Sequence, residues 1–305
     1  MTEDEVRRRL DPREVIEAIE AGFRDRYPHV SMPPRTVSAF GGDVFLAMSC
    51  VDGVTRALGL KLVVVHAAPG PSGDRVRATY LLLDPDTAAP RLQLPAGELT
   101  AIRTAATSAV ATRHLAPERV ESLGIFGTGR QAVAHLRLLP LVRPFTRVLV
   151  CGRTADQAAA FVRAHQPSIA ARMEAADPRR CATESDVLCT CTTATTPLFQ
   201  GAWLHAGAHL NLVGAFQPDT REVDDETIGR AAVVVDTREG ALAEAGDLLI
   251  PMRAGETATI VADLHELVSR GRPAPIPGDI TVFKSVGCAL EDLVTAELLA
   301  SSRST

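Results

Sequence analysis

The chain has 305 residues, of which 46% are hydrophobic and 23% are charged, so it is long enough for one large or two medium domains around a sizeable core. Its formal net charge of −5 argues against a general nucleic-acid-binding protein, because such domains usually carry a basic excess. The charged N-terminal stretch, the absence of a long charge-free apolar run and the scattered cysteines predict a cytoplasmic protein with free thiols and no membrane partner.

The first third of the chain combines a helix with several apolar runs. Apolar residues at helical spacing predict an amphipathic helix over residues 12–24. Four runs separated by Gly, Pro and Asp predict strands over 33–40, 43–50, 57–67 and 77–84. The turn at 84–90 indicates an antiparallel hairpin, and an Ala- and Leu-rich stretch predicts a long helix over 98–115. This part is therefore expected to be an α+β domain with an antiparallel sheet.

After residue 116 short apolar strands alternate with helices. The strands are expected within 121–127, 147–153, 186–192, 208–214, 231–237 and 279–285, with helices over 130–139 and 154–165. This alternation is typical of a doubly wound parallel sheet, so the fold class is α/β. We expect a first domain over 1–116, a second over 117–286, and a closing helical segment, 287–305, that returns to the first domain.

A glycine loop opens the second domain. The stretch "LGIFGTGRQA" carries G-x-G-x-x-A as Gly127, Gly129 and Ala132, leaving an apolar strand and starting a helix. Gly127 permits a tight turn, Gly129 lets a pyrophosphate approach the backbone, and Ala132 lets the helix pack on the strand. In this context the motif predicts a Rossmann-type site for a dinucleotide.

The end of the second strand of this domain bears on the choice between NAD and NADP. An acidic residue there would hold the ribose 2′-hydroxyl. The strand instead ends "CGRT", where Arg153 and Thr154 are suited to a 2′-phosphate. We therefore expect NADP(H), with NAD(H) as the alternative. Thr154 is also a candidate N-cap for the helix that follows.

Three basic residues of the first domain stand in apolar company: Lys61 inside "GLKLVVV", Arg35 behind two prolines, and Arg103 at the edge of an apolar helix face. A buried ammonium or guanidinium needs a negative partner. One interpretation is an anion pocket, in which arginine binds a carboxylate by two parallel hydrogen bonds and Lys61 also transfers a proton. The other is an internal salt bridge, for which the candidate partners are Asp43, Asp52, Asp84, Asp86 and Glu98.

Several stretches give the chain a resemblance to a known family: "PPRTV", "LGLKLVVV", "ELTAIRTAATSAVATRHLA", "LGIFGTGRQA", "GAHLNLVGA", "REVDDETIGRAAVVVDTREGALAEAGDL" and "FKSVGCALEDL". With these it resembles the ornithine cyclodeaminase/mu-crystallin family over nearly its whole length. The resemblance implies a substrate and dimerisation domain joined to a Rossmann domain, and a homodimer formed through the first domain. It also implies that Arg35, Lys61 and Arg103 bind the substrate carboxylate and that Met48 lines the pocket.

One position departs from the cyclodeaminase pattern. Those enzymes carry an aspartate after the "VGA" strand to handle the substrate amino group, and here Phe216 takes that place. The surrounding "VGAFQPDTRE" looks more like members that reduce cyclic imines such as Δ1-pyrroline-2-carboxylate. We therefore expect an NAD(P)H-dependent oxidoreductase acting on C=N bonds in proline metabolism. The alternatives are an ornithine cyclodeaminase, an alanine dehydrogenase-like enzyme, or a non-catalytic NADP-dependent ligand-binding protein.

The expected roles follow from these patterns. Lys61 is the candidate catalytic residue. Lys284, after the last strand, is expected to approach the nicotinamide or the domain hinge. No metal site is expected, because the C-x-C at Cys189 and Cys191 lacks a second ligand pair. The expected cofactor-binding residues are Thr104, Gly127, Thr128, Gly129, Arg130, Gln131, Arg153, Thr154, Thr192, Val213, Gly214 and Lys284.

Overall fold

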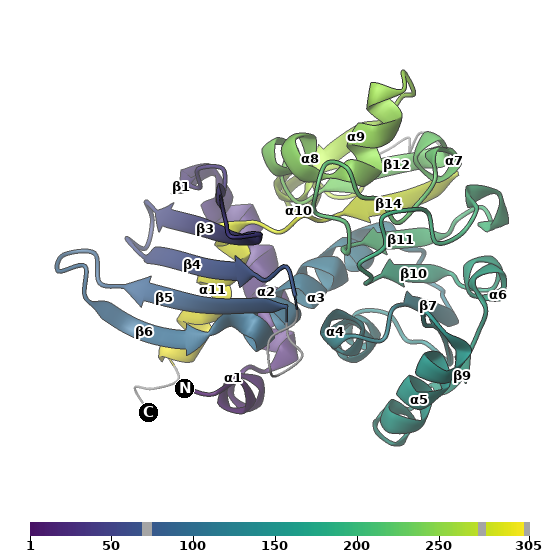
Figure 1. Cartoon of the computed structure of the whole chain (residues 1–305), viewed down its shortest axis with the longest axis horizontal. Coiled ribbons are helices and arrows are strands. Elements are labelled where there is room, and N and C mark those ends of the chain that lie inside the picture. Colours follow the sequence, from purple (N-terminus) through teal and green to yellow (C-terminus); the bar gives the residue numbers. More distant parts are fainter. Residues whose placement is uncertain (69–74, 274–278, 302–305) are drawn as a thin grey trace. The chain divides into compact units, whose positions relative to one another are not determined.

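The computed structural model describes residues 1–68, 75–273 and 279–301 and divides the chain into two compact units (Figure 1). Unit 1 comprises Met1–Arg103 and Cys288–Thr305, and unit 2 comprises Thr104–Gly287. The division lies within the continuous helix α3 (Ala96–Leu115), and so earlier than the domain boundary expected after residue 116.

Unit 1 contains an antiparallel sheet in the order β1-β3-β4-β5-β6, with β2 paired to β3. The prediction of an antiparallel sheet is thus confirmed. Along β4 the buried residues Gly59, Lys61 and Val63 alternate with half-buried leucines and valines, as expected for a strand with one face on a core. The strands are β1 (Val30–Ser31), β2 (Thr36–Phe40), β3 (Asp43–Asp52), β4 (Leu58–Val65), β5 (Val76–Leu83) and β6 (Pro90–Pro95).

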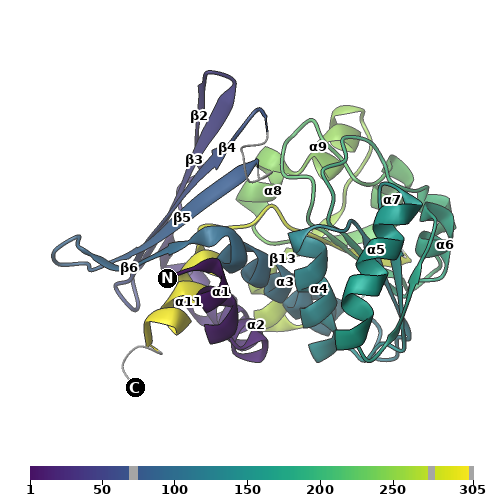
Figure 2. The same cartoon turned by 60° about the horizontal axis from the view of Figure 1, so that its bottom comes forward.

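Helix α11 (Ala289–Ser301) lies on the buried face of this sheet, against β3, β4 and β5 (Figure 2). Helix α2 (Pro12–Ala21) packs against α11 in turn. It ends earlier than the expected residue 24, in a π-helical turn, Gly22–Arg26. A side chain at Gly22 would lie 2.9 Å from a methyl carbon of Val294, so a glycine is needed for this close approach. Helix α1 (Glu3–Arg9) was not expected from the sequence.

Unit 2 contains a parallel sheet in the order β13-β12-β14-β11-β10-β7-β8-β9. Nearly all of its central strand residues are buried, which is why the sequence shows continuous apolar runs rather than alternation. The expected α/β class is confirmed. The strands are β7 (Ser122–Phe126), β8 (Arg147–Cys151), β9 (Arg172–Ala175), β10 (Val187–Thr190), β11 (His209–Leu212), β12 (Ala231–Val235), β13 (Ile260–Asp263) and β14 (Ile280–Lys284).

The chain order reverses between β7 and β10: β8 and β9 follow on one side of β7, and β10 and β11 on the other. Ligands of such sheets bind at the carboxyl ends of the strands beside this reversal. The helices of unit 2 lie between successive strands in the sequence and connect one strand to the next. They are α4 (Arg130–Leu138), α5 (Ala155–His165), α6 (Pro178–Thr183), α7 (Asp225–Arg230), α8 (Arg238–Glu244), α9 (Gly246–Arg253) and α10 (Leu264–Arg270).

Candidate functional site

A buried cation cluster lies in unit 1, where α11 crosses β4. The alternation of β4 turns Lys61 towards the helix, and its side chain is only 4% exposed. Its Nζ lies 2.6 Å from Oδ2 of Asp292, which is fully buried. The lysine that stands alone in an apolar run therefore has a carboxylate partner inside the protein.

Arg103, in the first half of α3, joins the same cluster. One terminal nitrogen of its guanidinium donates to Glu291 Oε2 at 2.6 Å, and Nε donates to Asp292 Oδ1 at 3.1 Å. The two oxygens of Asp292 thus serve Arg103 and Lys61 separately. Two cations and two carboxylates form one neutral, buried group, the Lys61–Asp292 cluster.

The two cations of this cluster differ in how readily they lose a proton. Burial lowers the pKa of Lys61 to about 8, with Arg103 acting in the same direction and Asp292 against it. Burial also works against the charge of Arg103, but the carboxylates of Asp292 and Glu291 raise its pKa overall. Lys61 is therefore the member that can lose a proton near neutral pH, whereas Arg103 stays charged.

Of the two interpretations of the buried cations, the internal salt bridge is observed for Lys61 and Arg103. Their partners, Glu291 and Asp292, come from α11, near the C-terminal end of the sequence. The five candidate carboxylates of the first domain have other contacts. The contacts of those carboxylates are Asp43 with His66, Asp52 with Arg26, Asp84 with Thr87, Asp86 with Arg56, and Glu98 with Arg7. The missed signal was the adjacent acids in "CALEDL", two charges in an apolar helix.

Two further expected residues stand beside the cluster in the sheet. Met48 of β3 is buried and is the direct cross-strand neighbour of Lys61, with Tyr80 of β5 on the other side. Half-buried Arg35 directly precedes Thr36, whose partner is Ala47, the neighbour of Met48. The register thus brings Arg35, Met48 and Lys61 to one level of the sheet.

The glycine loop lies in unit 2, between β7 and α4. Gly127 has a φ of +114°, and a side chain there would lie 2.5 Å from the carbonyl oxygen of Cys191, so only glycine fits. Gly129 is the N-cap of α4, makes no side-chain cap, and has open space around its Cβ position. Ala132 is fully buried. An open glycine before helix N–H groups that have no side-chain cap fits a pyrophosphate.

The other expected cofactor residues of unit 2 are distributed around the same sheet. Exposed Arg153 and Thr154 follow β8, and the Thr154 hydroxyl caps α5 by accepting from the Gln157 N–H. Thr192 follows β10, and Val213 and Gly214 follow β11. The last residue of β10, Thr190, pairs with the last residues of β11 and of β7. The remaining residues are Thr104, buried in α3, and Thr128, Arg130 and Gln131, in the loop and the first turn of α4.

Lys284 ends β14, but its side chain is fully buried. Its Nζ donates to the carbonyl oxygen of Ala215 at 2.5 Å and to Asp247 Oδ2 at 2.8 Å. Its ammonium contacts a loop that follows β11. Lys284 can therefore affect a bound cofactor only indirectly, by fixing the position of the loop that contains Ala215.

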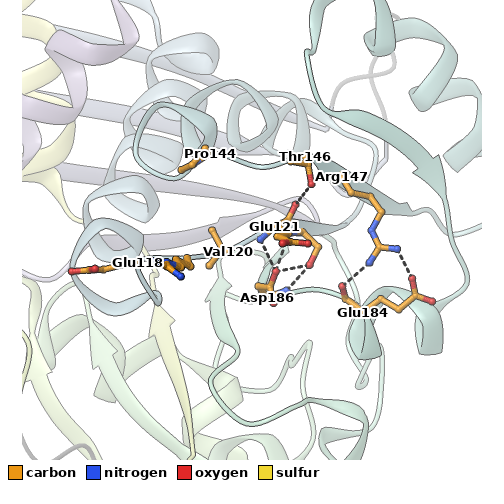
Figure 3. A pocket seen from close by; sticks show the side chains of 10 residues that line it. Glu118, Val120, Glu121, Pro144, Thr146, Arg147, Glu184 and Asp186 are labelled. Atoms are coloured by element: carbon orange, nitrogen blue, oxygen red, sulfur yellow. Dashed lines mark hydrogen bonds and ion pairs between the residues drawn. The ribbon is translucent and has the colours of Figure 1, made fainter.

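A hollow of about 830 Å³ lies at the opposite, amino edge of the parallel sheet (Figure 3). Three of its charged side chains have partners: Arg147 pairs with Glu184 at 2.8 Å, and Asp186 accepts from the N–H groups of Glu121 and Ser122. The carboxyl edge, with the glycine loop, is therefore the better candidate for a ligand site.

Within the described parts of the chain, no three His, Cys, Asp or Glu side chains are grouped so that they could hold a metal ion. All six cysteines are free, and Cys189 of the C-x-C is a buried residue of β10. Nor does any described helix combine the length and apolar character needed to cross a membrane.

Comparison with known proteins gives consistent matches over the whole chain. The sequence profile of the ornithine cyclodeaminase/mu-crystallin family matches residues 1–304. The ketimine reductase mu-crystallin of Rattus norvegicus is 39% identical over 261 residues, which cover 85% of this chain and 80% of the rat protein.

Two solved structures are similar along their full length. A Δ1-pyrroline-2-carboxylate reductase of Thermococcus litoralis, in complex with NADH and L-proline, has a TM-score of 0.93 and 33% identity, covering 99% of this chain and 96% of that one. An archaeal alanine dehydrogenase dimer with bound NAD has a TM-score of 0.90 and 27% identity, covering 100% of this chain and 96% of that one.

Proposed function

The chain belongs to the ornithine cyclodeaminase/mu-crystallin family, and on that premise we propose that it is an NAD(P)H-dependent reductase of small, cyclic 2-imino acids such as Δ1-pyrroline-2-carboxylate. The observation that carries this proposal is the Lys61–Asp292 cluster. It places two buried cations, each paired with a carboxylate of α11, side by side, and one of them is a lysine of lowered pKa that can donate a proton. Similar proteins are named for the reduction of such imines.

The residues of unit 1 bind and orient the substrate. Arg35 has a guanidinium group suited to a carboxylate, and Lys61 has three N–H donors, of which Asp292 accepts one. Arg103, which binds Glu291 and Asp292, adds positive charge beside them. Fixing the carboxylate fixes the C=N bond of a small imino acid, and such orientation supplies much of the rate. Met48 gives the adjacent apolar contact.

The residues of unit 2 hold the cofactor. Gly127 and Gly129 let the pyrophosphate approach the N-terminus of α4, whose N–H groups have no side-chain cap. When bound, the nicotinamide cofactor supplies the hydride for the imine carbon. Lys61 then donates a proton to the nitrogen, so that the C=N double bond becomes a CH–NH single bond.

Phe216 argues against the cyclodeaminase alternative. It lies in the loop after β11 and its side chain is 40% exposed. A phenyl ring neither accepts a proton nor binds an ammonium, so the loop lacks the group that a diamine substrate needs at this position.

NADP(H) is the cofactor that we propose. Arg153 is exposed two residues after the end of β8, where an acid would select the 2′-hydroxyl of NAD, and no acid stands in residues 151–154. The Thr154 hydroxyl already caps α5, so Arg153 is the principal candidate for the 2′-phosphate. The similar solved structures contain NADH or NAD, which keeps NAD(H) as the alternative.

A homodimer formed through unit 1 is also proposed. The outward face of its sheet carries Val51, which is 46% exposed, together with half-buried Leu58, Leu60 and Leu62. A broad apolar face of this kind is suited to a second copy. A similar alanine dehydrogenase is described as a dimer.

The free state of all six cysteines supports a reducing compartment, and we propose the cytoplasm.

A substrate panel tests the proposed reaction. NADPH oxidation should be measured with pyrroline-2-carboxylate, with piperideine-2-carboxylate and with pyruvate plus an amine, and ammonia release should be measured separately with ornithine. We expect oxidation with the cyclic imines and loss of turnover in Lys61→Ala and Arg103→Ala. Oxidation only with pyruvate plus ammonia would favour the alanine dehydrogenase alternative, and ammonia from ornithine the cyclodeaminase.

A further inference from the structure

Glu222 is a fully buried carboxylate at the carboxyl edge of the unit 2 sheet, outside the expected cofactor residues. Its Oε1 accepts from the N–H of Thr192 at 2.9 Å and from the Thr192 hydroxyl at 2.7 Å. Its Oε2 accepts from the Thr190 hydroxyl and from the N–H of Gly214, both at 2.7 Å. One side chain therefore ties the end of β10 to the loop that follows β11.

Asp247, also fully buried, holds Glu222 in place. Its Oδ1 accepts from the N–H groups of Glu222 and Val223 at 2.7 and 3.1 Å. Its Oδ2 accepts from the Lys284 ammonium, which also binds the carbonyl oxygen of Ala215. The loop after β11 is thus held at Gly214 by Glu222 and at Ala215 by Lys284.

These loops belong to the second half of the fold. In a doubly wound sheet the strands on either side of the reversal each serve one nucleotide of a dinucleotide. On the proposed function, the end of β8 with Arg153 binds the adenine nucleotide, whose ribose carries the 2′ group. The ends of β10 and β11, on the other side of β7, then bind the nicotinamide nucleotide. Thr192, Val213 and Gly214 are the residues that would contact it.

We propose that Glu222, Asp247 and Lys284 form a positioning network that fixes the backbone at Thr192 and Gly214 for binding of the nicotinamide half of the cofactor. This inference rests on the proposed cofactor binding, and it assigns these three residues a role through the loops rather than by contact with the cofactor. It also explains why Gly214 has no side chain, since a Cβ there would collide with the Glu222 carboxylate and with the carbonyl oxygen of Thr192.

A carboxylate is required at position 222. Each of its two oxygens faces one backbone N–H and one threonine hydroxyl. In Glu222→Gln the amide nitrogen would face a backbone N–H in either orientation, and an NH₂ group has no lone pair to accept it. The substitution thus keeps the volume and disrupts the positions of the two loops.

The test compares four proteins: the wild type, Glu222→Gln, Thr190→Val and the control Asp186→Asn. Thr190 is fully buried, and valine has its shape without the donor. Asp186 is the control, because it accepts three hydrogen bonds from the start of a neighbouring strand at the amino edge of the sheet. The dissociation constant for NADPH is measured by fluorescence, the free energy of unfolding by urea, and KM for the imino acid by turnover.

We expect the NADPH dissociation constant to rise about tenfold in Glu222→Gln, because a buried backbone N–H loses its acceptor. In Thr190→Val the carboxylate loses only one donor, and we expect a rise of about threefold. The KM for the imino acid stays within about twofold, as the substrate carboxylate is bound by unit 1. Asp186→Asn loses stability and keeps its affinity for NADPH.

Wild-type affinity for NADPH in folded Glu222→Gln would overturn the inference, as would an equal loss of affinity in Asp186→Asn. Should Glu222→Gln not fold, Thr190→Val decides, since unchanged NADPH binding there overturns the inference and weakened binding supports it. A wild-type protein that binds neither NADPH nor NADH would instead contradict the proposed function itself.

Discussion

The ammonium of Lys61 lies 2.6 Å from the carboxylate of Asp292, and the same carboxylate also accepts from Arg103 at 3.1 Å. A strand from the first part of the chain and a helix from its end thereby share one buried charge cluster. Because burial and the two carboxylates act in opposite directions, the lysine is left with a pKa of about 8, close to the range in which a proton donor works well.

Removing the carboxylate should change the pH dependence of turnover. In Asp292→Asn, burial and Arg103 still lower the pKa of Lys61, but the charge that raises it is gone. Protonated Lys61 is the proposed donor, so activity is lost as the pH rises through its pKa. We expect the alkaline limb of kcat/KM, near pH 8 in the wild type, to move to lower pH by about one unit or more.

The control is Glu297→Gln, which alters another carboxylate of α11 that pairs with Arg26 at 2.7 Å. Its alkaline limb should stay in place. An unmoved limb in active Asp292→Asn would show that the charge of Lys61 does not govern turnover.

Gly129 should be dispensable for folding but not for cofactor binding. Its Cβ position is open and its φ of −91° suits any residue, so Gly129→Ala should change the free energy of unfolding by less than about 1 kcal/mol. The added methyl blocks the approach of the pyrophosphate, and the NADPH dissociation constant should rise at least about tenfold.

Isothermal titration calorimetry and urea unfolding measure the two effects of this substitution. Gly229→Ala, at another open glycine of unit 2, is the control and should change NADPH binding little. Full affinity in Gly129→Ala would place the pyrophosphate elsewhere.

Arg153 should set the preference for NADPH. In Arg153→Ser we expect KM for NADPH to rise about tenfold with little change for NADH, because a charge-assisted hydrogen bond to the 2′-phosphate is lost. The control is Arg163→Ser, at an exposed arginine of α5, the helix that follows Arg153. An equal effect on both cofactors would assign Arg153 another role.

The outward face of the unit 1 sheet should hold the dimer together. Leu62 is half-buried on that face, directly between Ala47 and Thr79 of the neighbouring strands. Leu62→Glu places a charge in the interface and should shift the sedimentation equilibrium to the monomer. Leu242→Glu, at a 49% exposed leucine of α8, should leave the assembly unchanged. A Leu62→Glu protein that keeps the wild-type mass would refute this interface.

The spacing of apolar residues and glycines along the sequence was sufficient to predict the two sheets and the glycine loop. Alternation along β4 and continuous apolar runs in unit 2 report directly on which faces are buried. The same reasoning singled out Lys61, because a lone charge in an apolar strand needs a partner.

The sequence did not reveal which residues pair with the buried charges. Asp292 follows Arg103 by 189 positions, and no local rule connects residues at that separation. Glu222 was missed for the same reason, since its four donors come from two other strand ends. Helix α1 was missed although Thr2 and Glu5 form a capping box that the pattern T-x-x-E indicates.

Transfer of a deuterium label tests the central claim most directly. Pyrroline-2-carboxylate is incubated with the enzyme and NADPH that carries deuterium at the transferred position, and the product is analysed by mass spectrometry and NMR. We predict proline with one deuterium on its α-carbon, formed in equal amount to the NADP⁺ produced. Failure to oxidise NADPH with this imine, or proline without deuterium, would contradict the assignment as an imine reductase.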